Sequence, residues 1–550
     1  MPKRRSAKPN RPPRLDRAWV WALIIGLVGA LLYAPTLRFG FIGYDDTLLI
    51  TQNQEFLSRL SNIGRAFLQG AWRVPGFDGG NIYYRPVYTL SFMFDSQFDG
   101  SNPLAFHLSN VVQHGIVSGL VFALLLAMGN TRPVAAVGAL FFAVHPTFVH
   151  VVAWVPGRAD SLLAIFALTS VLALALLQRS AQVSDARKRV LLLAHWILFA
   201  LALFTKESAI VLPLLGGVLL LHRPTSVDRR IVVAGWIPTI VLWAVLRSVS
   251  VDTPNDFPTL VTNVLRHAIV PVHYLGKAVV PLGLSVTPTI ADTSSVFGIV
   301  VLVGLTLCAF LSKSRRPFLI GFGVLWFLAF ILPSLSVPRK AALEQRMYLP
   351  MVGFLLLVLG FVQVPKARSV RWGVATVLAI YLGLLATITI GRFDAYSSRI
   401  AFWENAVATA PHASYARASL GAVYVARSRY QEAEEQYQAA VELNPLEPKA
   451  NHNLGFLAAQ REDYESAARY FEREIQINPG FADAYFNLGQ VLSTLGRPEE
   501  ALSLWVRTLE IAPGHEPALA SAVQYYVSVG KRQEAENLIA RYGDRARKRP

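Results

Sequence analysis

The chain has 550 residues, of which 53% are hydrophobic and only 16% are charged, and its mean hydropathy is +0.40. Soluble proteins carry about 25% charged residues, so this composition excludes an ordinary soluble protein and indicates a polytopic membrane protein. The net charge of +17 comes from short basic segments between apolar runs, as the positive-inside rule predicts. We therefore predict no nucleic-acid partner. The single cysteine excludes a disulfide within one chain.

Residues 1–17 form the densest basic segment, and we predict a cytoplasmic tail there. The apolar run at residues 18–36 has no small-residue cleavage site and continues into Pro35. A removed signal peptide would need such a site. This first run is therefore predicted to be a retained membrane span.

Apolar runs of about the length that a helix needs to cross a bilayer recur along residues 18–391. We predict eleven spans, at residues 18–36, 106–128, 134–152, 161–178, 190–204, 208–221, 231–247, 295–312, 318–334, 348–364 and 373–391.

A twelfth run, residues 263–282, contains Arg266 and Lys277 and is interrupted by prolines. Charges inside a span are costly, and a crossing here would move later basic segments to the outer side. We therefore predict a re-entrant or interfacial helix on the outer side. With eleven crossings the C-terminal region also lies outside, and the first outer loop covers residues 37–104.

The C-terminal part repeats with a period of 34 residues. Three features recur at this spacing: a Leu-Gly pair in one helix, a small residue in the next helix, and a proline. The prolines are Pro411, Pro445, Pro479 and Pro513. Such a pattern is typical of the tetratricopeptide repeat. Residues 392–542 are therefore predicted to be an extracytoplasmic α-solenoid, with units beginning near 412, 446 and 480, a degenerate final unit at 514–542 and a basic tail at 543–550.

Two adjacent acids, Asp45 and Asp46, follow the first span in the stretch "FGFIGYDDTLLI". Asp is common in turns and at helix N-termini, so a structural role is the alternative to a functional one. Adjacent side chains point in different directions on a strand or a helix. At most one of the two acids is therefore expected to meet a substrate, while the other orients it, binds a metal or caps the backbone.

Other polar residues lie at the predicted outer ends of spans. The basic ones suit a lipid-linked phosphate, because Arg binds two oxygens at once, but an interfacial or buried structural role is the alternative for each. His145 and His150 are five residues apart, which is poor spacing for two ligands on one helical face. The candidates are Arg85, His145, His150, Arg158, Asp160, Lys206, Glu207, Arg346 and Tyr348.

Six stretches occur in one order before the repeats: "GYDDTLLI", "YYRPVYTLSFMFD", "FHLSNVVQH", "HPTFVHVVAWVPGRADSL", "TKESAIVLP" and "QRMYLPMVGF". Together they resemble the transmembrane and tetratricopeptide-repeat protein O-mannosyltransferases, within the GT-C class of glycosyltransferases. The resemblance implies an all-α protein with a GT-C-like membrane domain. It also implies an inverting enzyme that moves mannose or a similar sugar from a polyprenyl- or dolichyl-phosphate donor to a Ser or Thr hydroxyl.

The family pattern puts an acid of the first outer loop at the catalytic centre, which here means Asp45 or Asp46. A carboxylate removes the acceptor proton and cations stabilise the leaving phosphate. The resemblance implies no certain cofactor, although a divalent metal is compatible with it. The repeat groove is expected to bind a protein or peptide acceptor. Expected donor contacts are Arg85, Arg158, Lys206, Arg346 and Tyr348, and expected supporting residues are His145, His150, Asp160 and Glu207.

The sequence has no Asn-x-Ser/Thr sequon, which favours a bacterial inner membrane with periplasmic repeats over the endoplasmic reticulum. Two other functions stay open at this stage. One is a non-enzymatic scaffold that uses its repeats to assemble an envelope complex. The other is an O-antigen ligase-like transferase, although such enzymes tend to carry essential Arg and His in a late outer loop rather than acids in the first.

Overall fold

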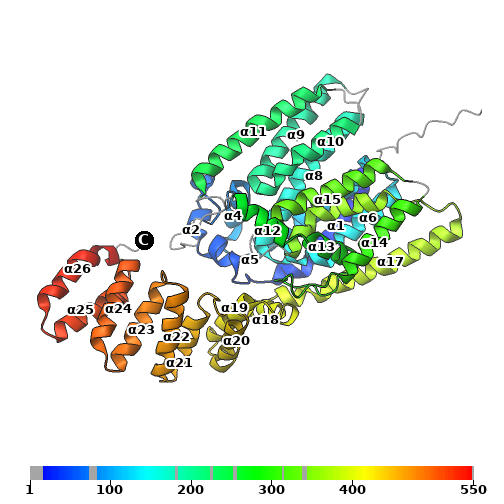
Figure 1. The fold of residues 1–550 in the computed structure, drawn as a ribbon. Coiled ribbons are helices and arrows are strands. Elements are labelled where there is room, and N and C mark those ends of the chain that lie inside the picture. The colour runs from blue at the N-terminus through cyan, green and yellow to red at the C-terminus, as the bar shows by residue number, and fades with distance from the viewer. Residues whose placement is uncertain are drawn as a thin grey trace, which may run out of the picture. The chain divides into compact units, whose positions relative to one another are not determined.

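The computed structural model describes residues 17–72, 83–179, 184–222, 227–251, 257–312, 315–336 and 343–547. Within these ranges every regular element is a helix (Figure 1), which confirms the all-α prediction. The chain divides into two compact units, residues 1–402 and 403–550. Of the predicted N-terminal basic tail, residues 1–17, only Arg17 lies within the described residues.

Seven helices of unit 1, some with an adjoining turn, are long and apolar enough to cross a membrane, so the described residues form a multi-pass membrane protein. These helices are α1 (Ala18–Tyr33), α5 (Pro103–Ala127), α8 (Arg158–Arg179), α9 (Asp185–Thr205), α11 (Arg229–Ser250), α15 (Pro317–Leu335) and α17 (Arg368–Gly391).

The other predicted spans also coincide with helices, but shorter ones. They are α6 (Arg132–Ala143) with α7 (Val149–Ala153), α10 (Leu212–His222), α14 (Val296–Leu311) and α16 (Tyr348–Leu359). Counting α6 and α7 as one bent span gives eight spanning-length segments in the described residues. The total of eleven crossings stays a prediction.

The predicted span at 134–152 is a bent pair of helices rather than one straight helix. Helix α6 ends at Ala143, and the chain bends by 46° before the short helices that begin at Pro146. Proline has no N–H to bond the carbonyl four residues earlier and its ring clashes with that carbonyl. This break separates α6 from α7.

The ambiguous run at 263–282 is covered by two helices of ten residues each, α12 (Phe257–Arg266) and α13 (Val270–Val279). A membrane-spanning helix needs about 20 residues. Neither helix is long enough to cross a bilayer by itself, which is consistent with the predicted non-spanning segment.

Small residues bring the membrane helices close together. A Cβ atom placed on Gly26 of α1 would lie 2.8 Å from the carbonyl oxygen of Gly115 on α5, and one on Gly323 of α15 would lie 2.4 Å from the backbone nitrogen of Leu357 on α16. Small residues are common where membrane helices pack, because they let backbones approach. These contacts set the close packing of α1 on α5 and of α15 on α16.

The first outer loop is folded rather than extended. Its helical turns bury a common apolar core against Phe106 of α5 and Ala159 of α8. The loop is thereby held against the outer ends of two membrane helices. Its elements are a π-helical turn (Thr47–Thr51), α2 (Gln54–Leu57), a 3-10 turn (Leu60–Asn62), α3 (Ile63–Ala66) and α4 (Pro86–Asp99).

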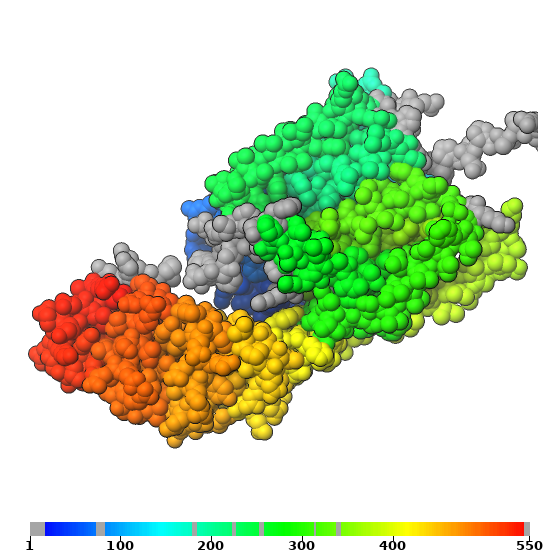
Figure 2. Space-filling view, in the orientation of Figure 1, coloured from blue at the N-terminus to red at the C-terminus, as the bar shows by residue number. Residues whose placement is uncertain are grey.

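Unit 2 consists of paired helices, which confirms the predicted tetratricopeptide-repeat pattern at the C-terminus. Side chains fill the space between successive repeat helices, coloured yellow to red in Figure 2. The helices are α18 (Arg399–Thr409), which begins in unit 1, α19 (Ser414–Val425), α20 (Tyr430–Leu443), α21 (Ala450–Gln460), α22 (Tyr464–Ile477), α23 (Ala482–Thr494), α24 (Pro498–Ile511), α25 (Glu516–Ser528) and α26 (Arg532–Arg547).

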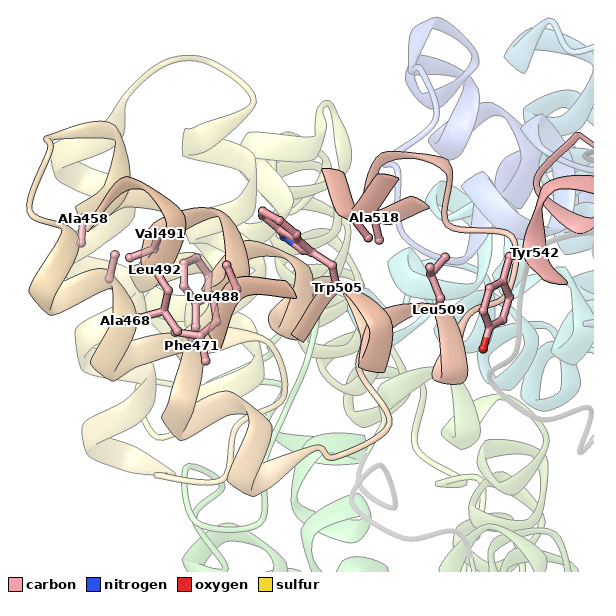
Figure 3. Close-up of a cluster of buried hydrophobic side chains, with 13 residues drawn as sticks. Ala458, Ala468, Phe471, Leu488, Val491, Leu492, Trp505, Leu509, Ala518 and Tyr542 are labelled. Carbon is pink, nitrogen blue, oxygen red and sulfur yellow. The ribbon is translucent and has the colours of Figure 1, made fainter. Parts of the chain in front are cut away.

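The repeated Leu-Gly pair has a specific packing role. A Cβ atom on Gly455 would lie 2.9 Å from the Phe471 ring, and one on Gly489 would lie 2.6 Å from the Trp505 ring. Both aromatic side chains belong to the buried core of the repeats (Figure 3). The glycine of one helix thus makes room for the aromatic ring of its partner helix.

Candidate active site

Asp46 fixes the turn that carries the acid pair. Its carboxylate accepts hydrogen bonds from the backbone N–H groups of Ile42 (2.6 Å), Tyr44 (3.1 Å) and Gly43 (3.4 Å), and only 1% of the residue is exposed. Gly43 has φ +73°, a conformation that glycine adopts readily. Burial raises the pKa of Asp46, and the three N–H groups partly counter that rise. Asp46 therefore holds this turn in place.

Asp45 is half-buried, in contrast to its neighbour. Its charge acts on the phenols of Tyr44 and Tyr88. The Tyr44 ring stacks on Trp154, with 5.9 Å between ring centroids. Of the two acids, Asp45 is the one that keeps access to solvent and lies among aromatic side chains.

Four of the charged residues that we predicted from sequence come together as two ion pairs. Arg85, at the start of α4, donates from Nε to Glu207 (2.9 Å), and its second contact to the same carboxylate makes the pair bidentate. The Lys206 ammonium donates to Asp160 of α8 (2.6 Å). All four side chains keep 12–33% of their surface exposed. We call these four residues the rim cluster.

Electrostatics within the rim cluster follow from these contacts. Burial raises the pKa of Glu207, but the Arg85 guanidinium outweighs burial and holds it at about 2. Burial lowers the pKa of Lys206, while Asp160 opposes that shift. The cluster holds two positive and two negative groups, so its net charge is zero when all four are ionised.

The acid pair and the rim cluster lie on the same side of unit 1. Charges of Arg85, Asp45 and Asp46 all act on the Tyr88 phenol, which donates to the Pro156 carbonyl (2.9 Å). Tyr88 thus lies between the two groups. The sequence candidates Asp45, Asp46, Arg85, Asp160, Lys206 and Glu207 are therefore brought into one region.

Arg346 belongs to the same region. Its guanidinium donates to the Ser334 carbonyl (2.8 Å), and the residue is half-buried in a 3-10 turn (Glu344–Met347). Charges of both Arg346 and Asp160 act on the Tyr274 phenol of α13. Arg346 therefore lies near the rim cluster and keeps donor groups that these contacts do not use.

Arg158 does not belong to an open site, so the prediction that it contacts a donor phosphate is corrected. Its side chain is fully buried and forms an ion pair with Asp95 of α4. It also donates to the Asn110 side chain (2.9 Å) and to the Phe106 carbonyl (2.7 Å), both on α5. Each of its three nitrogens is used in the fold, so Arg158 anchors the first loop to α5 and α8.

Tyr348 is also a core residue rather than a donor contact. It is fully buried, and its hydroxyl lies 2.8 Å from Nδ1 of His114. Nε2 of His114 lies 3.0 Å from the Ala143 carbonyl. A carbonyl only accepts, so Nε2 carries the hydrogen and Nδ1 accepts from the phenol. The Tyr348 hydroxyl is therefore used within the core.

The two histidines predicted as supporting residues have structural roles. His145 is fully buried, with Nδ1 2.8 Å from the Thr147 hydroxyl and Nε2 3.3 Å from the Ala278 carbonyl of α13. His150 is 3% exposed and contacts the Tyr396 hydroxyl (3.2 Å). Both stabilise the turn between α6 and α8.

Sequence reasoning missed a buried ion triad next to this region. Glu344 is fully buried and accepts from Arg392 (2.8 Å), Lys277 (3.2 Å) and the Ser285 backbone N–H (2.8 Å). Burial raises the pKa of Glu344, but the positive charges of Arg392 and Lys277 outweigh burial and keep this pKa below its usual value. The only signal was one charged residue in each of three separate parts of the chain, without any indication that they meet.

Metal ligation was left open by the sequence. Across the described ranges, no group of three or more His, Cys, Asp or Glu residues is arranged to hold a metal ion. The acid pair alone supplies at most two carboxylates.

Comparison with known proteins gives two kinds of family information. Tetratricopeptide-repeat profiles match residues 400–448 and 458–524. The protein O-mannosyl-transferase tmtc2 of Xenopus laevis is 34% identical over 151 residues, which are 27% of this chain and 18% of that protein. TMTC2 of Homo sapiens is 35% identical over 154 residues, with the same coverage of 27% and 18%.

Among solved structures, ArnT from Cupriavidus metallidurans bound to undecaprenyl phosphate aligns with a TM-score of 0.42 and 16% identity, over 86% of this chain and 80% of that chain. The predicted resemblance to protein O-mannosyltransferases is confirmed by the sequence relatives. The chain spans about a fifth of the length of these curated relatives.

Proposed function

We propose that this chain, a relative of the protein O-mannosyltransferases, is an inverting membrane glycosyltransferase of the GT-C class. It moves mannose or a similar sugar from a polyprenyl- or dolichyl-phosphate donor to a Ser or Thr hydroxyl of a protein acceptor. The observation that carries the proposal is the pairing of a locked Asp46 with a half-buried Asp45, within electrostatic reach of the rim cluster.

In this proposal Asp45 is the general base. Its carboxylate takes the proton of the acceptor hydroxyl while the hydroxyl oxygen attacks the anomeric carbon of the donor sugar. The bond from that carbon to the phosphate oxygen breaks, and the lipid phosphate leaves with the electron pair. A single displacement inverts the anomeric configuration. Positioned bases of this kind contribute about 10²–10⁴-fold to rate.

Lys206 and Arg346 are the proposed contacts of the donor phosphate. Lysine has three N–H donors, and Lys206 uses one of them on Asp160. Arg346 uses one nitrogen on a backbone carbonyl. Arg85 is held in a bidentate pair by Glu207, so we assign it to orienting the loop beside the phosphate. Cations at a leaving phosphate act by stabilising its developing charge.

The repeats are proposed to bind the protein or peptide acceptor, because stacked helix pairs form an extended concave surface. We propose a cytoplasmic N-terminus and repeats on the outer side, in a bacterial inner membrane or, in a eukaryote, in the endoplasmic reticulum membrane. The membrane lipid itself and the lipid-linked sugar are then the remaining partners, and nucleic acid is not one.

The test uses the full chain in lipid nanodiscs with radiolabelled mannosyl-phosphoryl polyprenol and an envelope protein extract. We expect label on protein that resists lipid extraction. No transfer, together with capture of a defined protein complex by the chain, would favour a scaffold instead. A reporter fused after Pro550 tests the orientation, since it should be active only on the outer side.

A further inference from the structure

A cavity of about 140 Å³ lies between α13 and the start of α14. One buried water needs roughly 10–15 Å³ by the same kind of measure, so the space is about ten times larger. Its lining comes from α13, the following loop and α14, and includes no residue of the acid pair or the rim cluster. The chemically important lining residues are His273, Lys277, Asp292, Thr293, Ser294 and Phe297.

The cavity has a rigid wall. Helices α13 and α14 meet backbone to backbone, because a Cβ atom on Gly276 would lie 2.7 Å from the backbone nitrogen of Gly298. Side chains cannot move into a gap of that kind. The cavity therefore lies beside a closely packed helix pair.

Two buried polar side chains with unused bonding capacity form its floor. Lys277 is 4% exposed and, among the described residues, makes one hydrogen bond, to Glu344 (3.2 Å). An ammonium group has three N–H donors. His273 is 2% exposed; its Nε2 contacts the Ser295 hydroxyl (2.9 Å), and its Nδ1 has no partner in the described part of the chain. Leaving a buried polar atom unsatisfied costs about 1–3 kcal/mol.

The charges around the cavity favour an uncharged ligand. Lys277 and Arg392 are balanced by Glu344, which touches both, and by Asp292, which lines the cavity. A phosphate would approach the Asp292 carboxylate, and a cation would approach Lys277. Burial and the neighbouring Lys277 lower the pKa of His273, so its imidazole stays neutral. A hydroxyl group both donates and accepts and therefore suits this mixed set.

Apolar surface completes the site. Phe297 is 40% exposed and Leu282 is 60% exposed, and both line the cavity. Small-molecule sites commonly combine apolar walls with a few placed polar groups. The apolar C–H face of a sugar ring would pack on such a wall while its hydroxyls reach the floor.

We infer that the cavity between α13 and α14 binds a neutral, hydroxyl-rich ligand about the size of one sugar ring. The inference does not rest on the proposed transferase activity. It assigns α13 and the loop that follows it a binding role that is separate from the acid pair.

The test is saturation-transfer NMR and calorimetry on the full chain in nanodiscs, with methyl α-D-mannopyranoside as the probe. We expect saturable binding that weakens at least tenfold in Asp292→Asn and in Lys277→Met. Lys188→Met, which changes a half-buried lysine on α9, should bind like the parent. Thermal unfolding of each variant checks that it is folded.

Three results would overturn the inference. The first is a folded parent that does not bind the probe. The second is binding that persists in both Asp292→Asn and Lys277→Met while Asp45→Asn abolishes it, which would place the sugar at the acid pair. The third is inorganic phosphate binding at the cavity in place of the sugar, with Lys277→Met removing it.

Discussion

Arg158 and Asp160 are two residues apart at the start of α8, yet they lie in different kinds of surroundings. Arg158 is fully buried and its nitrogens are used by Asp95 and by groups of α5. Asp160 pairs with Lys206 at the rim, where both side chains stay partly exposed. We call a pair closed when both side chains are buried and open when both keep part of their surface exposed. A closed pair near a membrane face is structural, whereas an open pair is available for binding.

The largest expected effect comes from breaking the closed pair. Arg158→Met leaves the Asp95 carboxylate buried without its partner, which typically costs about 3–5 kcal/mol. We expect that loss of unfolding free energy in chemical denaturation of the purified protein. Lys188→Met is the matched control at a pair whose Asp185 side chain is 80% exposed, with a change below about 1 kcal/mol. A variant as stable as the control would remove the distinction between the two pairs.

The sequence alone does not distinguish the buried Arg158 from the partly exposed Lys206. Residue type and position at a predicted span end put Arg158 and Lys206 in the same class of candidate. Burial separates them, and burial depends on Asp95 and Asn110, which lie far away in the chain. A single sequence gives no information on such pairings.

What the sequence predicted well depends on local pattern. Hydropathy found helices at each predicted span, because a span is one continuous apolar run. The 34-residue period found the repeats, because each repeat packs its glycine against its own aromatic residue, as Gly455 does against Phe471. The buried Glu344 triad was missed because its three members meet only in the folded chain.

A second closed network gives the next largest effect. Glu344→Gln removes the charge that holds Lys277 and Arg392 together in a buried site. Hydrogen bonds to charged groups contribute about 1.5–3 kcal/mol, so we expect a loss of about 2–3 kcal/mol in the same denaturation experiment. A loss below about 1 kcal/mol would mean that this buried triad behaves like an open pair.

The open pair should respond in the opposite way. Lys206→Met removes an ion pair whose two side chains keep only 12–15% of their surface exposed. The cost should lie between that of an exposed pair, about 0–1 kcal/mol, and that of a broken buried pair, about 3–5 kcal/mol. We expect a smaller loss of stability than in Arg158→Met and transfer of sugar reduced at least tenfold, because the proposed phosphate contact is lost. Normal transfer with lowered stability would show that Lys206 is structural, like Arg158.

The smallest effect concerns pH. Arg85 holds the pKa of Glu207 at about 2, below its ordinary value of 4.5. The pair therefore contributes its full stability above about pH 4.5 and loses it as pH falls toward about 2. The difference in melting temperature between the parent and Glu207→Gln should be constant above pH 5 and shrink below about pH 4.5. Partial exposure of Glu207 makes this difference small, and a difference that grows on acidification would contradict the assignment.

The central claim is that the two acids have separate roles, with Asp45 as the base and Asp46 as its orienting neighbour. The most direct measurement compares sugar transfer and thermal unfolding of Asp45→Asn and Asp46→Asn in the same preparation. The account predicts that Asp45→Asn lowers transfer about 100-fold or more with an unchanged melting temperature, and that Asp46→Asn lowers the melting temperature as well. Transfer that survives in folded Asp45→Asn would contradict it.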